Sequence, residues 1–178
     1  MKSIGKKGNP RFSTVYYYLG VVLAFNILIW ITPVLAIYGS QFSAPLYSFF
    51  SLFCHQMFER SLCLSTGFNL GNCDLDSAFT YQFPVCSRDT AFYFTMLIGG
   101  AVYYFQGKKN ELRTPSLYIL VLFVLPLAID GTTQLFGLRE STNVLRILTG
   151  GLAGLIIPFF LIPISNRLVY SVGFRKKK

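Results

Sequence analysis

The sequence has few charged side chains for its length. Only 13% of its 178 residues are charged and 53% are hydrophobic, whereas soluble domains carry about 25% charged residues. The mean hydropathy is +0.51, and several apolar stretches exceed the length of about 18 residues that a helix needs to cross a bilayer. These values exclude an ordinary soluble domain and predict a single integral membrane domain.

Histidine and several catalytic signatures are also scarce or absent. His55 is the only histidine, which excludes histidine-rich metal and haem sites. The chain has no glycine-rich phosphate loop, serine nucleophile elbow or His-Glu-x-x-His zinc helix. The net charge of +9 does not predict nucleic-acid binding, because the basic residues lie in both tails and one short turn without interleaved aromatic residues. It fits contact with the anionic headgroups of a lipid bilayer instead.

Hydropathy predicts an all-α integral membrane fold with four transmembrane helices. The expected spans are residues 15–37, 83–105, 115–135 and 142–164. They form one membrane domain, residues 15–166, between basic tails at residues 1–14 and 167–178. The first apolar run is longer than a typical signal-peptide core and no clean small-x-small cleavage site follows it, so we expect a retained helix.

Basic residues gather on one side of this four-span arrangement. Twelve of the sixteen lie in the tails or in the turn between the second and third spans: Lys2, Lys6, Lys7, Arg11, Lys108, Lys109, Arg113, Arg167, Arg175, Lys176, Lys177 and Lys178. Because cytoplasmic segments carry the excess of lysine and arginine, we expect a multi-pass cell-membrane protein with both termini in the cytoplasm. With three or five spans the basic residues would no longer gather on one side of the membrane.

Residues 38–82 and 136–141 are then the two outer connections. The unusual polar residues lie in them or within about two helical turns of the outer helix ends: Cys54, His55, Arg60, Cys86, Arg88, Asp89, Asp130, Gln134, Arg139, Glu140, Asn143 and Arg146. A charge at the depth expected for Arg146 costs on the order of 2.5–3.5 kcal/mol unless it is paired or reaches the surface. Asp130 is its expected counter-charge, and one interpretation is that this pair only locks two helices together.

This region has more hydrogen-bond donors than one helix-to-helix ion pair needs, which favours a binding site over a purely structural pair. We predict that an anionic lipid-linked or quinone-like substrate is bound by a set of guanidinium and amide groups: Arg88, Gln134, Arg139, Asn143 and Arg146. Candidate catalytic residues, for proton transfer and thiol chemistry, are Asp130, His55, Cys54 and Cys86.

The outer loop carries most of the sulfur. Residues 46–64 alternate apolar and polar residues at helical spacing, which predicts an amphipathic or re-entrant helix on which His55 and Glu59 share a face. All four cysteines are on the outer side, where disulfides persist. Three pairings are open, and Cys63 with Cys73 is the preferred bridge.

The other two thiols have three interpretations. Cys54 and Cys86 form a second disulfide, act in thiol redox chemistry with quinone, or join His55 and Asp89 as ligands of a zinc ion. The redox interpretation is weakened by the sequence CSRD at residues 86–89, which lacks the second thiol of a Cys-x-x-Cys motif. Separately, the spacing of Gly150 and Gly154 predicts close helix packing, with Gly99 and Gly100 as counterparts.

Four motifs occur in a fixed order: CHQMFERS at residues 54–61, FPVCSRDTAFY at 83–93, LPLAIDGTTQLFGLRESTN at 125–143 and LRILTG at 145–150. Together they resemble the prokaryotic membrane family catalogued as domain of unknown function 2085. The resemblance implies a small polytopic membrane protein and assigns no activity. The family pattern has a second cysteine where this chain has Asp89, which puts a Cys-x-x-Cys function in doubt here, although aspartate can ligate a metal.

Three functions stay open at this stage: a membrane enzyme acting at the outer leaflet, a non-catalytic binder or transporter of an anionic lipid or solute, and a structural membrane protein. The sequence predicts no particular oligomeric state.

Overall fold

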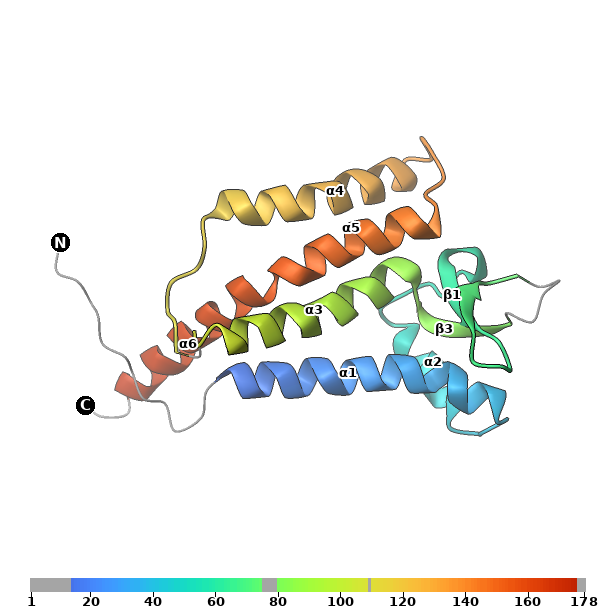
Figure 1. Ribbon diagram of the computed structural model, residues 1–178, viewed down its shortest axis with the longest axis horizontal. Helices are drawn as coiled ribbons and strands as arrows, with labels where there is room; N and C mark the ends of the chain where they lie inside the picture. The colour runs from blue at the N-terminus through green and yellow to red at the C-terminus, as the bar shows by residue number, and fades with distance from the viewer. Residues whose placement is uncertain (1–13, 75–79, 109, 176–178) are drawn as a thin grey trace.

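A computed structural model describes residues 14–74, 80–108 and 110–175, with side chains described as far as residue 171. Most of the basic residues expected in the two tails, together with Lys109, lie outside the described residues. The described chain is mostly helical, with a small sheet at one end (Figure 1).

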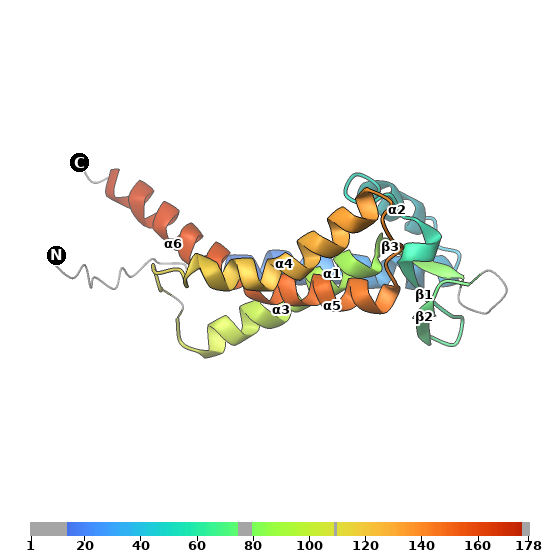
Figure 2. The same cartoon turned by 90° about the horizontal axis from the view of Figure 1, so that it is seen from above.

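Long helices run along the length of the molecule (Figures 1 and 2). They are α1 (Thr14–Ile37), α3 (Ser87–Phe105), α4 (Leu117–Leu135), α5 (Asn143–Ile156) and α6 (Pro158–Arg175), the last of which continues from the end of α5. Three stretches are long and apolar enough to cross a membrane: Thr14–Ile37, Leu117–Leu135 and Asn143–Ser171, the last made of α5 and most of α6. The chain therefore has the apolar helices of a membrane protein.

Helix α3 corresponds to the remaining one of the four expected spans, and it is less apolar than these three stretches because it begins with Ser87, Arg88 and Asp89. It packs against both α1 and α5. Glycines allow the approach to α5, since a Cβ atom on Gly154 would lie 2.2 Å from the Phe92 carbonyl oxygen and one on Gly99 would lie 2.3 Å from that of Leu155. The predicted small-residue packing is thus present for Gly99 and Gly154, whereas Gly100 packs against Tyr18 and Leu19 of α1.

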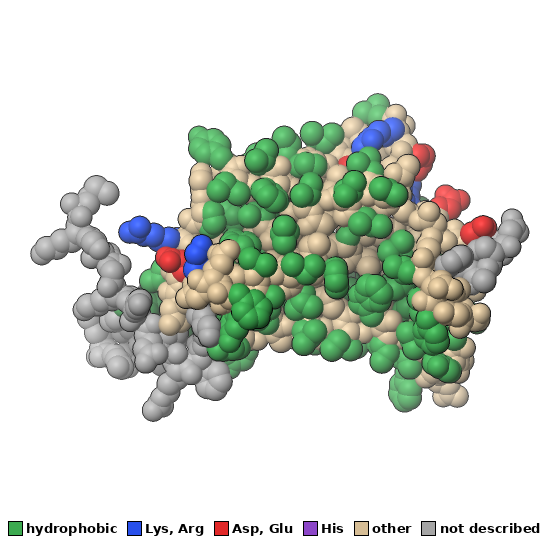
Figure 3. Space-filling view, in the orientation of Figure 1, with side chains coloured by type: hydrophobic (Ala, Val, Ile, Leu, Met, Phe, Trp, Pro, Cys, Tyr) green, Lys and Arg blue, Asp and Glu red, His purple; other side chains and the backbone are tan. Residues whose placement is uncertain are grey.

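Helix α4 shows which surface the bundle presents to its surroundings. Asp130 is its one buried residue, while Val121, Leu122, Leu125 and Ile129 are exposed. Figure 3 shows a broad apolar band across this face of the bundle, with the described charged side chains near its two ends. An exposed apolar surface of this extent is typical of contact with lipid.

The small sheet and a short helix lie at the end of the bundle opposite the start of α1 and the end of α6 (Figure 1). This end contains α2 (Ser43–Phe50), the 3-10 turn η1 (Phe58–Arg60), and the strands β1 (Ser61–Leu64), β2 (Leu70–Asn72) and β3 (Tyr81–Cys86). The strands are antiparallel in the order β2-β1-β3. Phe83 and Val85 of β3 form a buried core with Ile29 of α1 and Phe50 of α2.

Two expectations about secondary structure are wrong. The helix expected over residues 46–64 ends at Phe50, after which the chain turns and enters β1. The span expected from residue 83 begins as a helix only at Ser87, because Phe83 and Val85 belong to β3. Hydropathy measures apolar character, which a buried strand shares with a membrane helix, so the pattern could not separate them.

Candidate functional site

The first turn of α3 brings the sulfur residues together. Strand β3 ends at Cys86, and its backbone N–H donates to Cys54 Sγ, 3.3 Å away, in the loop after α2. Asp89, one helical turn further on, places its Oδ2 atom 3.2 Å from Cys86 Sγ. A strand end and a loop separated by about thirty residues therefore meet at one helix start.

The potential ligand atoms of Cys54, Cys86 and Asp89 all lie within 4.8 Å of one another. His55 does not belong to this group, because its side chain is exposed on the irregular segment between α2 and η1. It also makes no hydrogen bond or ion pair with Glu59 in the described part of the chain, since the helix that would align them does not form. The four-residue set predicted from the sequence is thus reduced to three.

The two thiols of this cluster differ in acidity. A side-chain hydrogen bond with Cys86 lowers the pKa of Cys54 below its ordinary value, although partial burial opposes the change. The same hydrogen bond, burial and the charge of Asp89 raise the pKa of Cys86. The shared hydrogen bond therefore makes Cys54 the more acidic of the two thiols.

Next to this cluster, Asp130 of α4 is held by two arginines. Its carboxylate forms a salt bridge with Arg88 of α3 and another with Arg139, whose Nη2 atom is 2.8 Å from Asp130 Oδ1. Arg88 Nη2 also donates to Gln134 Oε1 at 3.1 Å. Asp130 is only 1% exposed, so it is a buried carboxylate that two cations neutralise.

Arg146 does not pair with Asp130, contrary to the expectation from the sequence. It donates from Nη1 to Asn143 Oδ1 at 2.9 Å and forms no salt bridge among the described residues. The reason lies at Gly150, where a Cβ atom would approach the Arg88 carbonyl oxygen to 2.3 Å and Arg88 Cγ to 3.0 Å. Because Gly150 has no side chain, Arg88 can pack against α5 and form the salt bridge with Asp130.

Arg146 is nevertheless buried, with 3% of its surface exposed. Its Nε atom is buried without a hydrogen-bond partner, as are Arg88 Nε and Gln134 Nε2. Arg60 and Arg88 add positive charge within electrostatic range of Arg146. The end of the bundle that carries the sheet thus has more hydrogen-bond donors than the surrounding protein uses.

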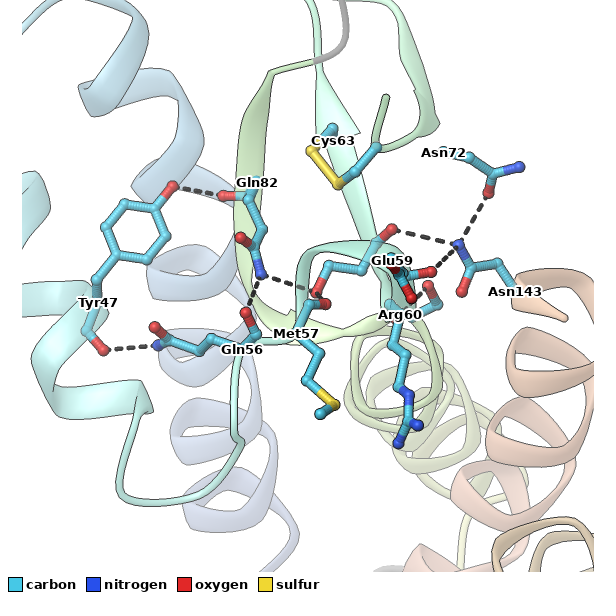
Figure 4. The surroundings of a disulfide bond; sticks show 12 residues. Tyr47, Gln56, Met57, Glu59, Arg60, Cys63, Asn72, Gln82 and Asn143 are labelled. Carbon is cyan, nitrogen blue, oxygen red and sulfur yellow. Dashed lines mark hydrogen bonds between the residues drawn. A yellow bond between two sulfur atoms is a disulfide. The ribbon is translucent and has the colours of Figure 1, made fainter. Parts of the chain in front are cut away.

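A network of amide side chains fixes the loop that carries Cys54 (Figure 4). Gln56 Nε2 donates to the carbonyl oxygens of Tyr47, at 2.7 Å, and Pro84, at 3.0 Å. Gln82 Nε2 donates back to the Gln56 carbonyl oxygen at 2.7 Å, and the Tyr47 hydroxyl donates to the Gln82 carbonyl oxygen. Tyr47 and Gln82 did not stand out in the sequence, because no local spacing links them to the cysteines.

Asn143 connects the sheet to the start of α5. Its Nδ2 atom donates to the Ser61 carbonyl oxygen at 3.3 Å and to Asn72 Oδ1 at 3.1 Å (Figure 4). Its Oδ1 atom is therefore turned to accept from Arg146. Asn143 thereby positions the arginine, a role that the helical spacing of the two residues predicted only in part.

The remaining two cysteines, Cys63 and Cys73, are joined by a disulfide (Figure 4). It links β1 to the segment that follows β2. This is the pairing that the sequence analysis preferred. Cys54 and Cys86 are free thiols in the structure.

Comparison with other proteins assigns the chain to a family. Residues 77–160 match the family model described as predicted membrane protein (DUF2085). An uncharacterized protein of Methanocaldococcus jannaschii is 36% identical over 164 residues, which cover 87% of this chain and 96% of the relative. The chain belongs to the DUF2085 family.

A second relative, an uncharacterized protein of Methanothermobacter thermautotrophicus, is 42% identical over 77 residues, 42% of this chain and 66% of the relative. No solved structure matches the chain. The DUF2085 match includes Cys86, Arg88, Asp89 and Arg146 but not Cys54. The sulfur cluster therefore joins the matched region to the loop that precedes it.

At the opposite end of this DUF2085 protein, a pocket of about 320 Å³ opens beside the α3–α4 connection. Tyr103 and Phe159 form its apolar part, and Lys108, Glu111 and Arg113 lie at its polar side. It is separate from the cysteine and arginine clusters, which lie at the end that carries the sheet.

Proposed function

We propose that this membrane protein binds a phosphate-bearing anion, the headgroup of a lipid or lipid-linked molecule, at the end of the bundle that carries the sheet. Arg146 is the principal binding residue, with Arg88, Arg139, Gln134 and Asn143 around it. The observation that carries the proposal is that Arg146 is 3% exposed and has no carboxylate partner in the described chain.

Burial without a salt bridge among the described residues makes Arg146 unusual. Moving an arginine into a membrane is costly unless the charge is paired or hydrated. The one side-chain hydrogen bond of Arg146 among the described residues is to a neutral amide, Asn143, which orients the guanidinium without neutralising it. A planar guanidinium with free donors suits the oxygen atoms of a phosphate.

The surroundings of Arg146 support the same ligand chemistry. Arg88 Nε and Gln134 Nε2 are further buried donors without partners. Helices α3 and α5 both begin at this end, and the start of a helix carries partial positive charge. Asp130 balances Arg88 and Arg139 only in part, so the cluster keeps a net positive charge that favours an anion.

The proposal includes an arrangement in the membrane. Helices α1, α3, α4 and the α5–α6 pair all cross it, the sheet faces the outside, and both termini are in the cytoplasm. Helix α3 crosses in spite of its polar first turn because Arg88 is paired with Asp130 at the outer helix end. The excess of basic residues in the tails supports this orientation.

The test measures binding to the purified full-length protein in lipid nanodiscs. Thermal stability is compared between discs of phosphatidylcholine alone and discs that also contain phosphatidylglycerol, and then with inorganic phosphate added to the neutral discs. We expect stabilisation by the anionic lipid that Arg146→Gln removes, because loss of a charged hydrogen bond costs about 1.5–3 kcal/mol. Arg113→Gln, at the opposite end of the bundle, makes the same charge change and should keep the wild-type response.

The two arms identify the source of the phosphate. Stabilisation by the lipid alone assigns a headgroup site, whereas stabilisation by inorganic phosphate alone assigns a site for a free anion and overturns the lipid part of the proposal. If the Arg146 variant responds as strongly as the wild type, the arginine does not bind the anion and the proposal fails.

A further inference from the structure

We propose that Cys54, Cys86 and Asp89 bind a zinc ion, with the fourth coordination position left for water or an exogenous ligand. This site goes beyond the anion site proposed above, because it depends on the sulfur atoms and not on the arginines.

The arrangement of ligand atoms is the first support. Two sulfurs and a carboxylate oxygen from three different parts of the chain lie within 4.8 Å of one another. Zinc–sulfur bonds are about 2.3 Å and zinc–oxygen bonds about 2.0–2.2 Å, so small side-chain movements would place all three atoms around one ion. Cysteine and carboxylate are both established zinc ligands.

The partners of Asp89 are the second support. The end of the bundle that carries the sheet contains several arginines, and two of them neutralise Asp130. Asp89 instead contacts the Cys86 thiol and forms no salt bridge among the described residues. A carboxylate and two thiols placed together repel one another once ionised, and because no salt bridge neutralises Asp89 among the described residues, a divalent cation would relieve this repulsion.

The backbone around Cys54 is the third support. The backbone N–H of Cys86 donates to Cys54 Sγ, and such a bond orients and stabilises a ligating thiolate. Gln56 adopts a φ of +52°, in the left-handed region that residues other than glycine rarely occupy. Its side chain and carbonyl make three hydrogen bonds to Tyr47, Pro84 and Gln82 that hold this strained conformation in place.

Three protein ligands are characteristic of zinc sites that act on a substrate, since structural zinc sites normally use four. The exposed His55 does not supply the fourth ligand. Asp89 and Arg88 are consecutive residues in the first turn of α3, so the metal and the arginine cluster share one helix start.

The experiment uses the full-length protein extracted from membranes and purified without a polyhistidine tag. Zinc is measured by elemental analysis, and reactive thiols are counted in the folded protein with and without a chelator and again after denaturation. We expect one zinc ion per chain, two thiols that react fully only in the presence of chelator, and one disulfide, Cys63–Cys73. Cobalt substituted for zinc should give a thiolate-to-metal charge-transfer band of the intensity typical of two sulfur ligands.

Variants then identify the ligands. Cys54→Ser, Cys86→Ser and Asp89→Asn should each lower the zinc content at least tenfold, whereas His55→Ala and Glu140→Gln should keep it. The cobalt spectrum of the wild type gives the number of sulfur ligands even if a cysteine variant fails to fold.

Two results would overturn the zinc site. One is a metal-free protein whose mass shows a second disulfide between Cys54 and Cys86. The other is a metal-bound protein whose cobalt derivative has no thiolate band. Because neither result involves phosphate or Arg146, the zinc site and the anion site can fail independently.

Discussion

The backbone N–H of Cys86 lies 3.3 Å from Sγ of Cys54, although the two residues are 32 positions apart in the chain. This contact closes the segment between α1 and α3 onto the start of α3. Arg88 and Asp89 follow in its first turn, so the sulfur cluster and the buried salt bridges of Asp130 belong to one continuous region. Substitutions in the sulfur cluster and in the salt bridges of Asp130 can therefore be compared as changes to one region of the protein.

Asp130 should contribute strongly to stability. Asp130→Asn removes the carboxylate that neutralises Arg88 and Arg139, and Arg88 is then left mostly buried without a counter-charge. Breaking one partner of a buried ion pair costs about 3–5 kcal/mol, which should appear in the free energy of unfolding measured by denaturant titration in detergent.

Glu140→Gln is the matched control for Asp130. It also removes an acidic partner of an arginine, but the Glu140 side chain is 84% exposed and its oxygen is 3.9 Å from Arg60. Exposed pairs contribute about 0–1 kcal/mol. Equal losses for the two variants would show that the Asp130 salt bridges are not the buried pairs described above.

The sequence predicted which residues gather at this end, but not how they pair. Helix ends and depths follow from hydropathy, and these place Asp130 and the arginines at one level. The partner of Asp130 depends on how closely α3 approaches α5, which is set by the absence of side chains at Gly150 and Gly154. The sequence shows where the glycines are, but it does not show that Arg88 lies against Gly150 of α5.

The segment between α1 and α3 was predicted least well, for a related reason. Strand β1 pairs with residues 70–72 on one side and residues 81–86 on the other. Such register depends on contacts between distant residues, whereas helical spacing is visible locally. The Cys63–Cys73 bridge was preferred, but the sequence could not select it, since Cys54 and Cys63 are slightly closer in the chain than Cys63 and Cys73. The exposure of His55 could not be predicted because it depends on where α2 ends.

Gly154 should tolerate no side chain. In Gly154→Ala the new Cβ atom would meet the Phe92 carbonyl oxygen at 2.2 Å and Thr95 Oγ1 at 2.4 Å, so α3 and α5 must separate. Overpacking of this kind costs about 1–3 kcal/mol, measurable as a lower midpoint of thermal unfolding. Gly151→Ala, three residues earlier in the same helix, meets only Thr95 Cγ2 at 3.5 Å and should leave the midpoint unchanged or slightly raised.

The Cys63–Cys73 disulfide should stabilise the sheet without affecting the long helices. Replacing both cysteines with serine removes a covalent link between residues ten positions apart in the chain. Loss of a native disulfide typically lowers the free energy of unfolding by about 2–4 kcal/mol. Hydrogen exchange should increase in β1 and β2 while α3 and α5 keep their protection. Treating the wild type with a reductant should reproduce the effect, and no change in either case would mean that the sheet is held by its other contacts.

The number of membrane crossings can be decided by finding on which side of the membrane each end of the chain lies. Helix α3 is less apolar than the three candidate spans, yet it packs between α1 and α5, so its polar residues need not face lipid. If α3 crosses, a reporter fused to the N-terminus and one fused to the C-terminus are on the same side. If it does not, three crossings place them on opposite sides.

We expect both reporters in the cytoplasm, together with a reporter inserted at Gly107 between α3 and α4. An insertion at Gly137, between α4 and α5, should report the outer side. Both glycines lie in turns with positive φ and open surroundings, so an insertion there disturbs little packing. Termini on opposite sides would remove α3 from the membrane-crossing set, and with it the environment in which the Arg88–Asp130 pair is proposed to act.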